Sequence, residues 1–185
     1  MHWLVIAVFV ITMTSLKPAH ALQYRKCVNP EDEAACLIAF RKVRTLINPI
    51  TKGRFFDDRL HSSKGELFMY PIFHIATPDL DGDQSPEIII RIDDYADGIP
   101  GLYCVGNNQC PHFIIQDRTL PDQNRTVNSM KAIGPIYSSG LALSTDERVD
   151  NFVSLRAYND PFWKSFDVYQ YDGESDNYFN MSVGP

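Results

Sequence analysis

The stretch that decides the fold is FHIATPDLDGDQSPEIIIRI, residues 73–92. Residues 73–76 and 87–92 are rich in the aromatic and β-branched residues that favour strands. Between them lies a short run of acidic residues, with Pro78 near its start and Pro86 near its end, and this composition predicts a turn. We therefore expect two antiparallel strands joined by an acidic loop.

The spacing of the carboxylates in this loop predicts a cation site. Counted from Asp79, acidic residues stand at positions 1, 3, 5 and 9. Alternate positions of a tightly wound loop turn toward one point, where four carboxylates repel one another unless a cation lies between them. Hard oxygen ligands favour calcium, and a main-chain carbonyl at position 7 completes the set. The sequence thus predicts calcium as the cofactor, with the ligands Asp79, Asp81, Asp83, Ser85 and Glu87.

The loop differs from an EF-hand, because position 12, where that motif needs a bidentate Glu, is Ile90. It resembles instead the calcium loop of FG-GAP and VCBS-type β repeats, and residues 79–87 match the pattern D-x-D-G-D-x-x-P-E. The resemblance implies a strand-loop-strand hairpin in which Asp79, Asp81, Asp83 and Glu87 are ligands. Gln84 stands where those repeats have a second glycine, a position suited to a left-handed backbone. Because the pattern occurs once in a short chain, the resemblance extends to the loop and not to a propeller fold.

Two other interpretations of the loop stay open. One is a solvated acidic turn that binds no ion. The other is the D-x-D-G nucleophile motif of haloacid-dehalogenase-type phosphatases, in which Asp79 attacks phosphorus and Asp81 acts as acid and base. That motif needs Thr or Val after its glycine, whereas this chain has Asp83. The alternative function is therefore a small metal-dependent hydrolase or phosphatase that uses the acidic loop together with His74.

The start of the chain predicts export. Residues 3–16 are almost wholly apolar but fall short of the about 20 residues that cross a bilayer. Ala19, His20 and Ala21 then give the small-x-small pattern of a signal-peptidase site. We expect residues 1–21 to be a signal peptide and residues 22–185 to be a single globular domain, periplasmic or secreted, without stable membrane insertion after cleavage.

The four cysteines, Cys27, Cys36, Cys104 and Cys110, all lie after this cleavage site. An even number in an exported chain predicts two disulfides, which can pair in three ways. We expect the local pairing, Cys27 with Cys36 and Cys104 with Cys110, because a turn-forming stretch separates the second pair. A metal site built on Cys104, Cys110 and His112 is the alternative, which an oxidising compartment disfavours.

The remaining pattern predicts an α+β fold, with an N-terminal helix packed on a mainly antiparallel β-sheet domain that contains the calcium-loop hairpin. Asn29 can cap the helix and Pro49 ends it. Residues 117–131 are polar and predict a long exposed loop, and residues 172–177 predict a hairpin turn. The expected strands are 67–76, 87–93, 101–105, 112–116, 133–143, 151–158, 166–171 and 178–183.

The charge balance and the absence of several sequence motifs limit the classes of function that we expect. Loss of residues 1–21 removes only Lys17 of the 17 basic residues, which leaves 16 against 23 acidic ones, so a nucleic-acid partner is not expected. The chain has no H-E-x-x-H zinc motif, no glycine-rich phosphate loop and no G-x-S-x-G nucleophile elbow. These features favour a non-enzymatic binding module, of the inhibitor or immunity type, that acts on a protein partner.

Overall fold

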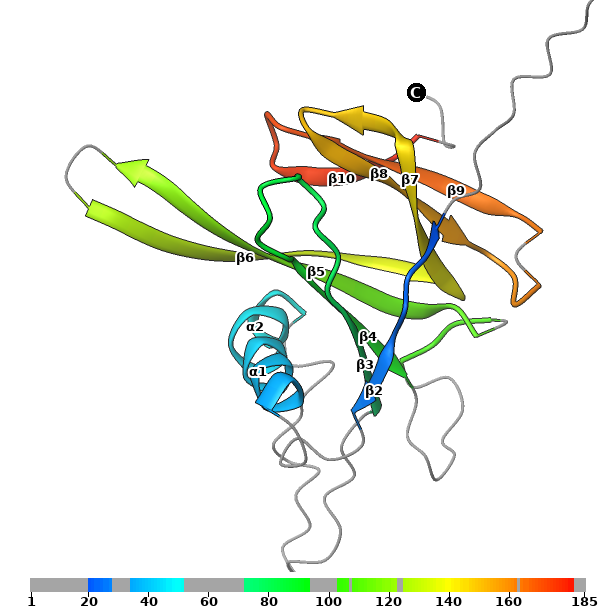
Figure 1. Ribbon diagram of the computed structural model, residues 1–185. Coiled ribbons are helices and arrows are strands. Elements are labelled where there is room, and N and C mark those ends of the chain that lie inside the picture. The colour runs from blue at the N-terminus through cyan, green and yellow to red at the C-terminus, as the bar shows by residue number, and fades with distance from the viewer. Residues whose placement is uncertain are drawn as a thin grey trace, which may run out of the picture.

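The computed structural model describes residues 20–27, 34–51, 72–93, 103–106, 108–122, 125–162 and 164–181. Two five-stranded sheets and one short helical segment make up this part of the chain (Figure 1). All the strand pairings are antiparallel. The prediction of a mainly antiparallel α+β domain is confirmed at this level.

The first sheet, which we call the helix-side sheet, carries the acidic loop. Its strands, in spatial order, are β2 (Arg25–Cys27), β3 (Ile72–Ala76), β4 (Ile88–Asp93), β5 (Cys110–Asp122) and β6 (Arg125–Ser138). The predicted strands on either side of the loop are confirmed over 72–76 and 88–93, because β3 pairs with β4 up to Ala76 opposite Ile89, and residues 67–71 lie outside the described part of the chain.

The second sheet, the outer sheet, is built almost entirely from the C-terminal half of the chain. Its spatial order is β1 (His20–Ala21), β7 (Gly140–Val149), β8 (Phe152–Tyr158), β9 (Phe166–Asp172) and β10 (Asn177–Asn180). The prediction of one strand over 133–143 is wrong, because the chain leaves one sheet for the other at Ser139, whose N–H donates to the carbonyl of Tyr158 at 2.7 Å. The predicted turn between β9 and β10 is confirmed.

The prediction of an exposed loop over 117–131 is also wrong. The β5–β6 ladder continues through this stretch as far as Asp122 opposite Arg125, and Figure 1 shows the two strands reaching well beyond the helix. Backbone hydrogen bonds between strands form with any side chains, and the sequence of this stretch lacks the alternation of apolar and polar residues that marks the other strands.

The helical segment packs on one face of the helix-side sheet. It consists of α1 (Ala34–Lys42), the π-helical turn η1 (Val43–Ile47) and α2 (Asn48–Ile50). A single regular helix from Asn29 to Pro49 is not supported, because the middle is π-helical and Pro49 lies within the last turn instead of ending the helix. The expected cap at Asn29 lies outside the described residues.

The side chains of the helix-side sheet alternate between two cores. Ile90, Ile92, Phe113 and Ile115 pack against the helical segment, whereas Ile89 and Ile114 pack against the outer sheet. This alternation follows from the two-residue period of a strand. The helical segment, the helix-side sheet and the outer sheet thus form three layers with an apolar core at each interface.

Both predicted disulfides are confirmed. Cys27 at the end of β2 is bonded to Cys36 in α1, and Cys104 is bonded to Cys110 at the start of β5. The alternative metal site on Cys104, Cys110 and His112 is therefore excluded, since both sulfur atoms are already bonded.

The predicted signal peptide lies mostly outside the described residues, which begin at His20. His20 and Ala21 form the edge strand β1, opposite Leu143 and Ala142 of β7. The N–H of Leu22 donates to the carbonyl of Leu141 at 3.1 Å, so cleavage after Ala21 would remove β1 and make this nitrogen the new amino terminus. None of the described helices is long and apolar enough to cross a membrane.

Candidate functional site

The acidic loop, residues 77–87, connects β3 to β4 and is attached to both sheets. The side chain of Leu80 is fully buried in the core between the sheets. The carbonyl of Leu80 accepts a hydrogen bond from the N–H of Val153 in β8 at 2.8 Å, and the N–H of Glu87 donates to the carbonyl of Pro78 at 2.9 Å. The loop is therefore held in one conformation between the two sheets.

Three of the predicted ligands converge. One carboxylate oxygen from each of Asp79, Asp81 and Glu87 lies within 4.8 Å of the others. Calcium–oxygen distances are about 2.3–2.6 Å, so oxygens that share one ion lie within about 5 Å of each other. The spacing of these three carboxylates therefore fits a single calcium ion, with the loop backbone or water supplying further oxygen ligands.

Backbone N–H groups of the loop orient these carboxylates. Gly82 donates to Oδ1 of Asp79 at 2.7 Å, and Leu80 donates to Oε2 of Glu87 at 2.6 Å. Asp81 accepts a bond of 3.1 Å from the N–H of Asp83. Because local hydrogen bonds fix the three acidic side chains, little rearrangement is needed to place their oxygens around a cation.

The fourth predicted acidic ligand is not part of this group of three. Oδ1 of Asp83 accepts a hydrogen bond from the N–H of Ser85 at 2.6 Å, and its side chain is exposed. The ligand expected from Ser85 is its main-chain carbonyl, which stays a prediction. The structure thus brings together three of the four predicted acidic ligands.

Burial makes this group of carboxylates electrostatically unusual. Glu87 is only 6% exposed, and burial raises its pKa to about 7, although the hydrogen bond from Leu80 acts in the opposite direction and the charge of Asp81 adds to the rise. Burial also raises the pKa of Asp81, and the charges of Asp83 and Asp79 contribute. Without a cation, the site therefore resists full ionisation.

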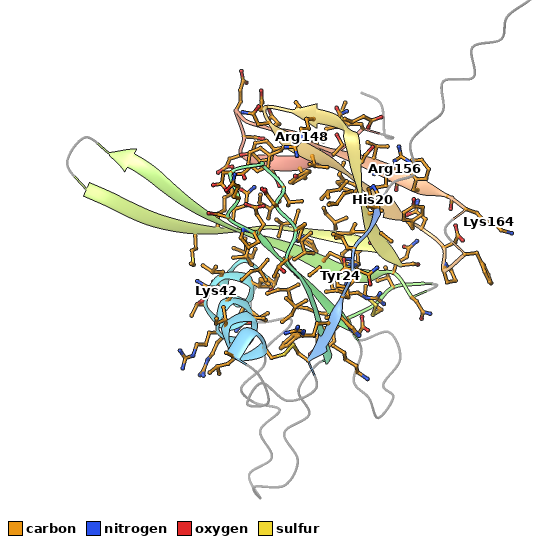
Figure 2. All side chains as sticks on the ribbon, in the orientation of Figure 1. His20, Tyr24, Lys42, Arg148, Arg156 and Lys164 are labelled. Atoms are coloured by element: carbon orange, nitrogen blue, oxygen red, sulfur yellow. A yellow bond between two sulfur atoms is a disulfide. The ribbon has the colours of Figure 1, made fainter. Side chains whose placement is uncertain are left out.

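The loop backbone contains two left-handed residues. Gly82 has φ +82°, and Gln84 has φ +73°, so the residue that replaces the second glycine of the repeat pattern does adopt the conformation that glycine adopts most easily. A Cβ atom added to Gly82 would lie 3.2 Å from Nη1 of Arg148, which Figure 2 labels on the outer sheet. Glycine at position 82 thus allows both the turn and the close approach of this guanidinium group.

One residue near the site was missed in the sequence. Gln116 is 2% exposed, and neither atom of its side-chain amide has a hydrogen-bond partner within the described part of the chain. Ile88 pairs with Ile115, so the next step of this antiparallel ladder places Gln116 beside Glu87. The only signal in the sequence for this buried polar residue is that a glutamine ends the apolar run 112–116.

The histidine chosen for the hydrolase alternative has a different partner. Nδ1 of His74 lies 3.1 Å from a carboxylate oxygen of Asp93, which also pairs with Arg91 at 2.6 Å. Burial acts to raise the pKa of Asp93, but the hydrogen bond with His74 and the charge of Arg91 lower it overall. The structure thus pairs His74 with Asp93 at the far end of β4, away from the converging carboxylates.

Comparison of the chain with protein-family models, with curated proteins and with solved structures found no match.

Proposed function

We propose that this chain is an exported binding module in which a single calcium ion, held by the acidic loop, stabilises the contact between the two sheets. Asp79, Asp81 and Glu87 supply the acidic ligands, and Asp83 and Ser85 complete the site from the solvent side. The module acts by binding a protein partner, as an inhibitor or immunity protein does, and not by catalysis.

The observation that carries this proposal is the convergence of three oriented carboxylates in a loop attached to both sheets. A buried acidic side chain such as Glu87 is costly unless it is protonated or paired with a cation. Two disulfides agree with an oxidising compartment, where millimolar calcium suits the modest affinity of extracellular calcium modules, about 0.1–1 mM.

Two features argue against catalysis by the histidines. His74, the best candidate for a base, lies with Asp93 at the end of β4 that is remote from the converging carboxylates. Nδ1 of the buried His112 lies 2.9 Å and 3.2 Å from the carbonyl oxygens of Cys110 and Ile136, so Nδ1 carries the proton and cannot accept one from Ser138.

Thermal unfolding tests the calcium site. The purified protein should unfold at a higher temperature in millimolar calcium than in EDTA, and magnesium should not reproduce the effect. Calcium at about 100 times its dissociation constant adds about 2.7 kcal/mol of stability. Asp81→Asn should abolish this gain, whereas the matched control Glu174→Gln, an exposed residue of the β9–β10 turn, should retain it. A gain that persists in Asp81→Asn would refute the assigned ligands.

Export is tested separately. The full chain produced in a bacterial host should appear outside the cytoplasm with Leu22 as its first residue, as read by intact mass. A product that stays in the cytoplasm with residues 1–21 attached would refute the predicted signal peptide and leave the calcium site to be judged by its own test.

A further inference from the structure

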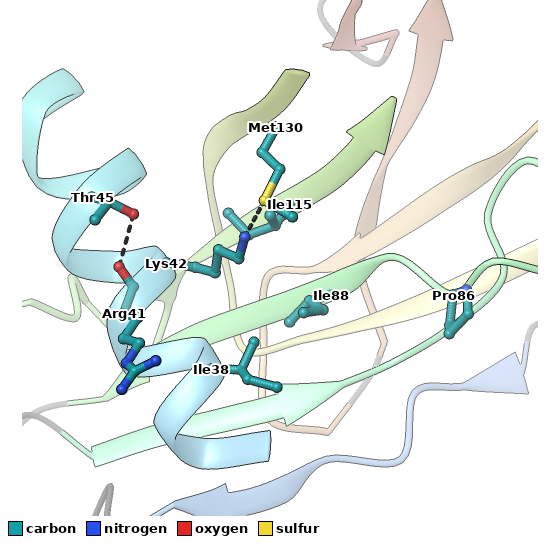
Figure 3. A pocket seen from close by; sticks show the side chains of 8 residues that line it. All are labelled: Ile38, Arg41, Lys42, Thr45, Pro86, Ile88, Ile115 and Met130. Carbon is teal, nitrogen blue, oxygen red and sulfur yellow. Dashed lines mark hydrogen bonds between the residues drawn. The ribbon is translucent and has the colours of Figure 1, made fainter. Parts of the chain in front are cut away.

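A groove runs between the helical segment and the helix-side sheet, on the face opposite to the outer sheet (Figure 3). Its volume is about 420 Å³. Ile38 of α1 and three strand residues, Ile88, Ile115 and Met130, provide apolar walls, and Arg41 and Lys42 of α1 provide positive charge. The groove thus combines an apolar interior with two cationic groups from one turn of helix.

The two cations have no acidic partner within the described residues. The ammonium group of Lys42 extends across the groove to the sulfur of Met130, as Figure 3 shows, and a thioether is only a weak acceptor. Arg41 and Lys42 thus place two neighbouring positive charges beside the apolar walls. These charges can attract an anion from outside the chain.

The apolar walls remain partly exposed to solvent. Ile38 is 46% exposed and Met130 is 37% exposed, so covering them would remove apolar surface from water. Small-molecule pockets have volumes of about 300–1,000 Å³, whereas a stable protein–protein interface takes about 20–30 residues from each partner. A groove of this volume therefore suits a small ligand better than a folded partner.

We propose that this groove binds a monomeric amphipathic anion, a carboxylate with an unbranched apolar tail. The tail lies on Ile38, Ile88, Ile115 and Met130, and the carboxylate accepts charge-assisted hydrogen bonds from Lys42 and Arg41. This inference does not depend on calcium, because none of the three converging carboxylates lines the groove.

Calorimetric titration of the whole purified protein with dodecanoate, below the concentration at which it forms micelles, tests the proposal. We expect saturable binding of one molecule per chain. Dodecyltrimethylammonium has the same tail with the opposite charge, and acetate has the same head without the tail, so both should bind at least tenfold more weakly.

Lys42→Met keeps the length of the side chain and removes its charge. Because a hydrogen bond to a charged group contributes about 1.5–3 kcal/mol, the variant should bind dodecanoate roughly tenfold more weakly or worse. The matched control is Lys26→Met, at an exposed position of β2 that does not line the groove, and its affinity should be unchanged. Ile38→Asp places a negative charge in the groove and should also weaken binding.

Several results would overturn the proposal. These are no saturable binding of dodecanoate, equal binding of the trimethylammonium compound, unchanged affinity in Lys42→Met, or binding to phosphatidylglycerol vesicles without binding of the monomer. Far-UV circular dichroism of each variant identifies one that fails to fold. If Lys42→Met fails to fold, Arg41→Gln and the ligand series on the unmodified protein decide the question.

Discussion

Leu80 connects the acidic loop to the core, and truncating it to alanine should destabilise the whole domain. The side chain is fully buried among residues of both sheets, including Ile89 of β4 and Leu155 of β8. Removal of a fully buried leucine side chain beyond Cβ costs about 2.7–5 kcal/mol, depending on how far the cavity collapses. The hydrogen bond from Val153 to the Leu80 carbonyl restrains the backbone against collapse, so we expect a loss of about 3–4 kcal/mol.

Urea unfolding, followed by circular dichroism, measures this loss. For a domain of this size, a loss of about 3–4 kcal/mol lowers the unfolding temperature by roughly 10 °C. The matched control is Leu37→Ala, in α1, where the side chain is 37% exposed and the loss should stay below about 1 kcal/mol. A loss of similar size in both variants would refute the inference that the loop is packed between the sheets.

Three further predictions concern other buried groups. Replacing Cys27 and Cys36 together by alanine should lower the free energy of unfolding by about 2–3 kcal/mol, because the disulfide closes a loop with a sequence separation of 9; an unchanged urea midpoint would contradict this. Burial lowers the pKa of His112 to about 3, whereas an unfolded histidine titrates near about 6.5. The unfolded state therefore binds one more proton between these values, so stability from this residue is lost as pH falls below about 6.5, by at most about 1.4 kcal/mol per pH unit. His112→Gln should show a weaker fall between pH 7 and pH 5, and parallel curves would exclude the effect. Gln116→Met removes an amide without a partner among the described residues, so it should stabilise the protein by about 1 kcal/mol or more in urea unfolding.

The elements that could be predicted from the sequence are those in which the local residue preferences favour the conformation that the folded protein adopts. The strands on either side of the acidic loop, β8, β9 and the turn before β10 follow from short apolar runs bounded by turn residues. The local disulfide pairing followed from the short turn-forming segment between Cys104 and Cys110. In each of these places a few neighbouring residues determine the structure.

Other elements depend on contacts that the local sequence does not reveal. The outer part of the β5–β6 ribbon has no apolar period in its sequence, so the alternation that marks the other strands is missing there. The passage from β6 to β7 at Ser139 was missed because apolar residues lie on both sides of it, and Ser139 and Gly140 were included in a single strand. Likewise, the spacing of the acidic loop predicted four convergent carboxylates, and the structure brings together three of them, Asp79, Asp81 and Glu87.

The position of the acidic loop determines what a bound cation would stabilise. In an isolated hairpin, an ion holds only the turn between two strands. Here the turn also carries Leu80 into the core between the sheets and accepts a hydrogen bond from β8. An ion that fixes this loop therefore stabilises the packing of the two sheets, and calcium should raise the stability of the whole domain and not only that of β3 and β4. Pro86 of the acidic loop and Ile88 at the start of β4 line the groove, whereas Asp79, Asp81 and Glu87 do not. The two proposed sites are therefore neighbours that share no side chain.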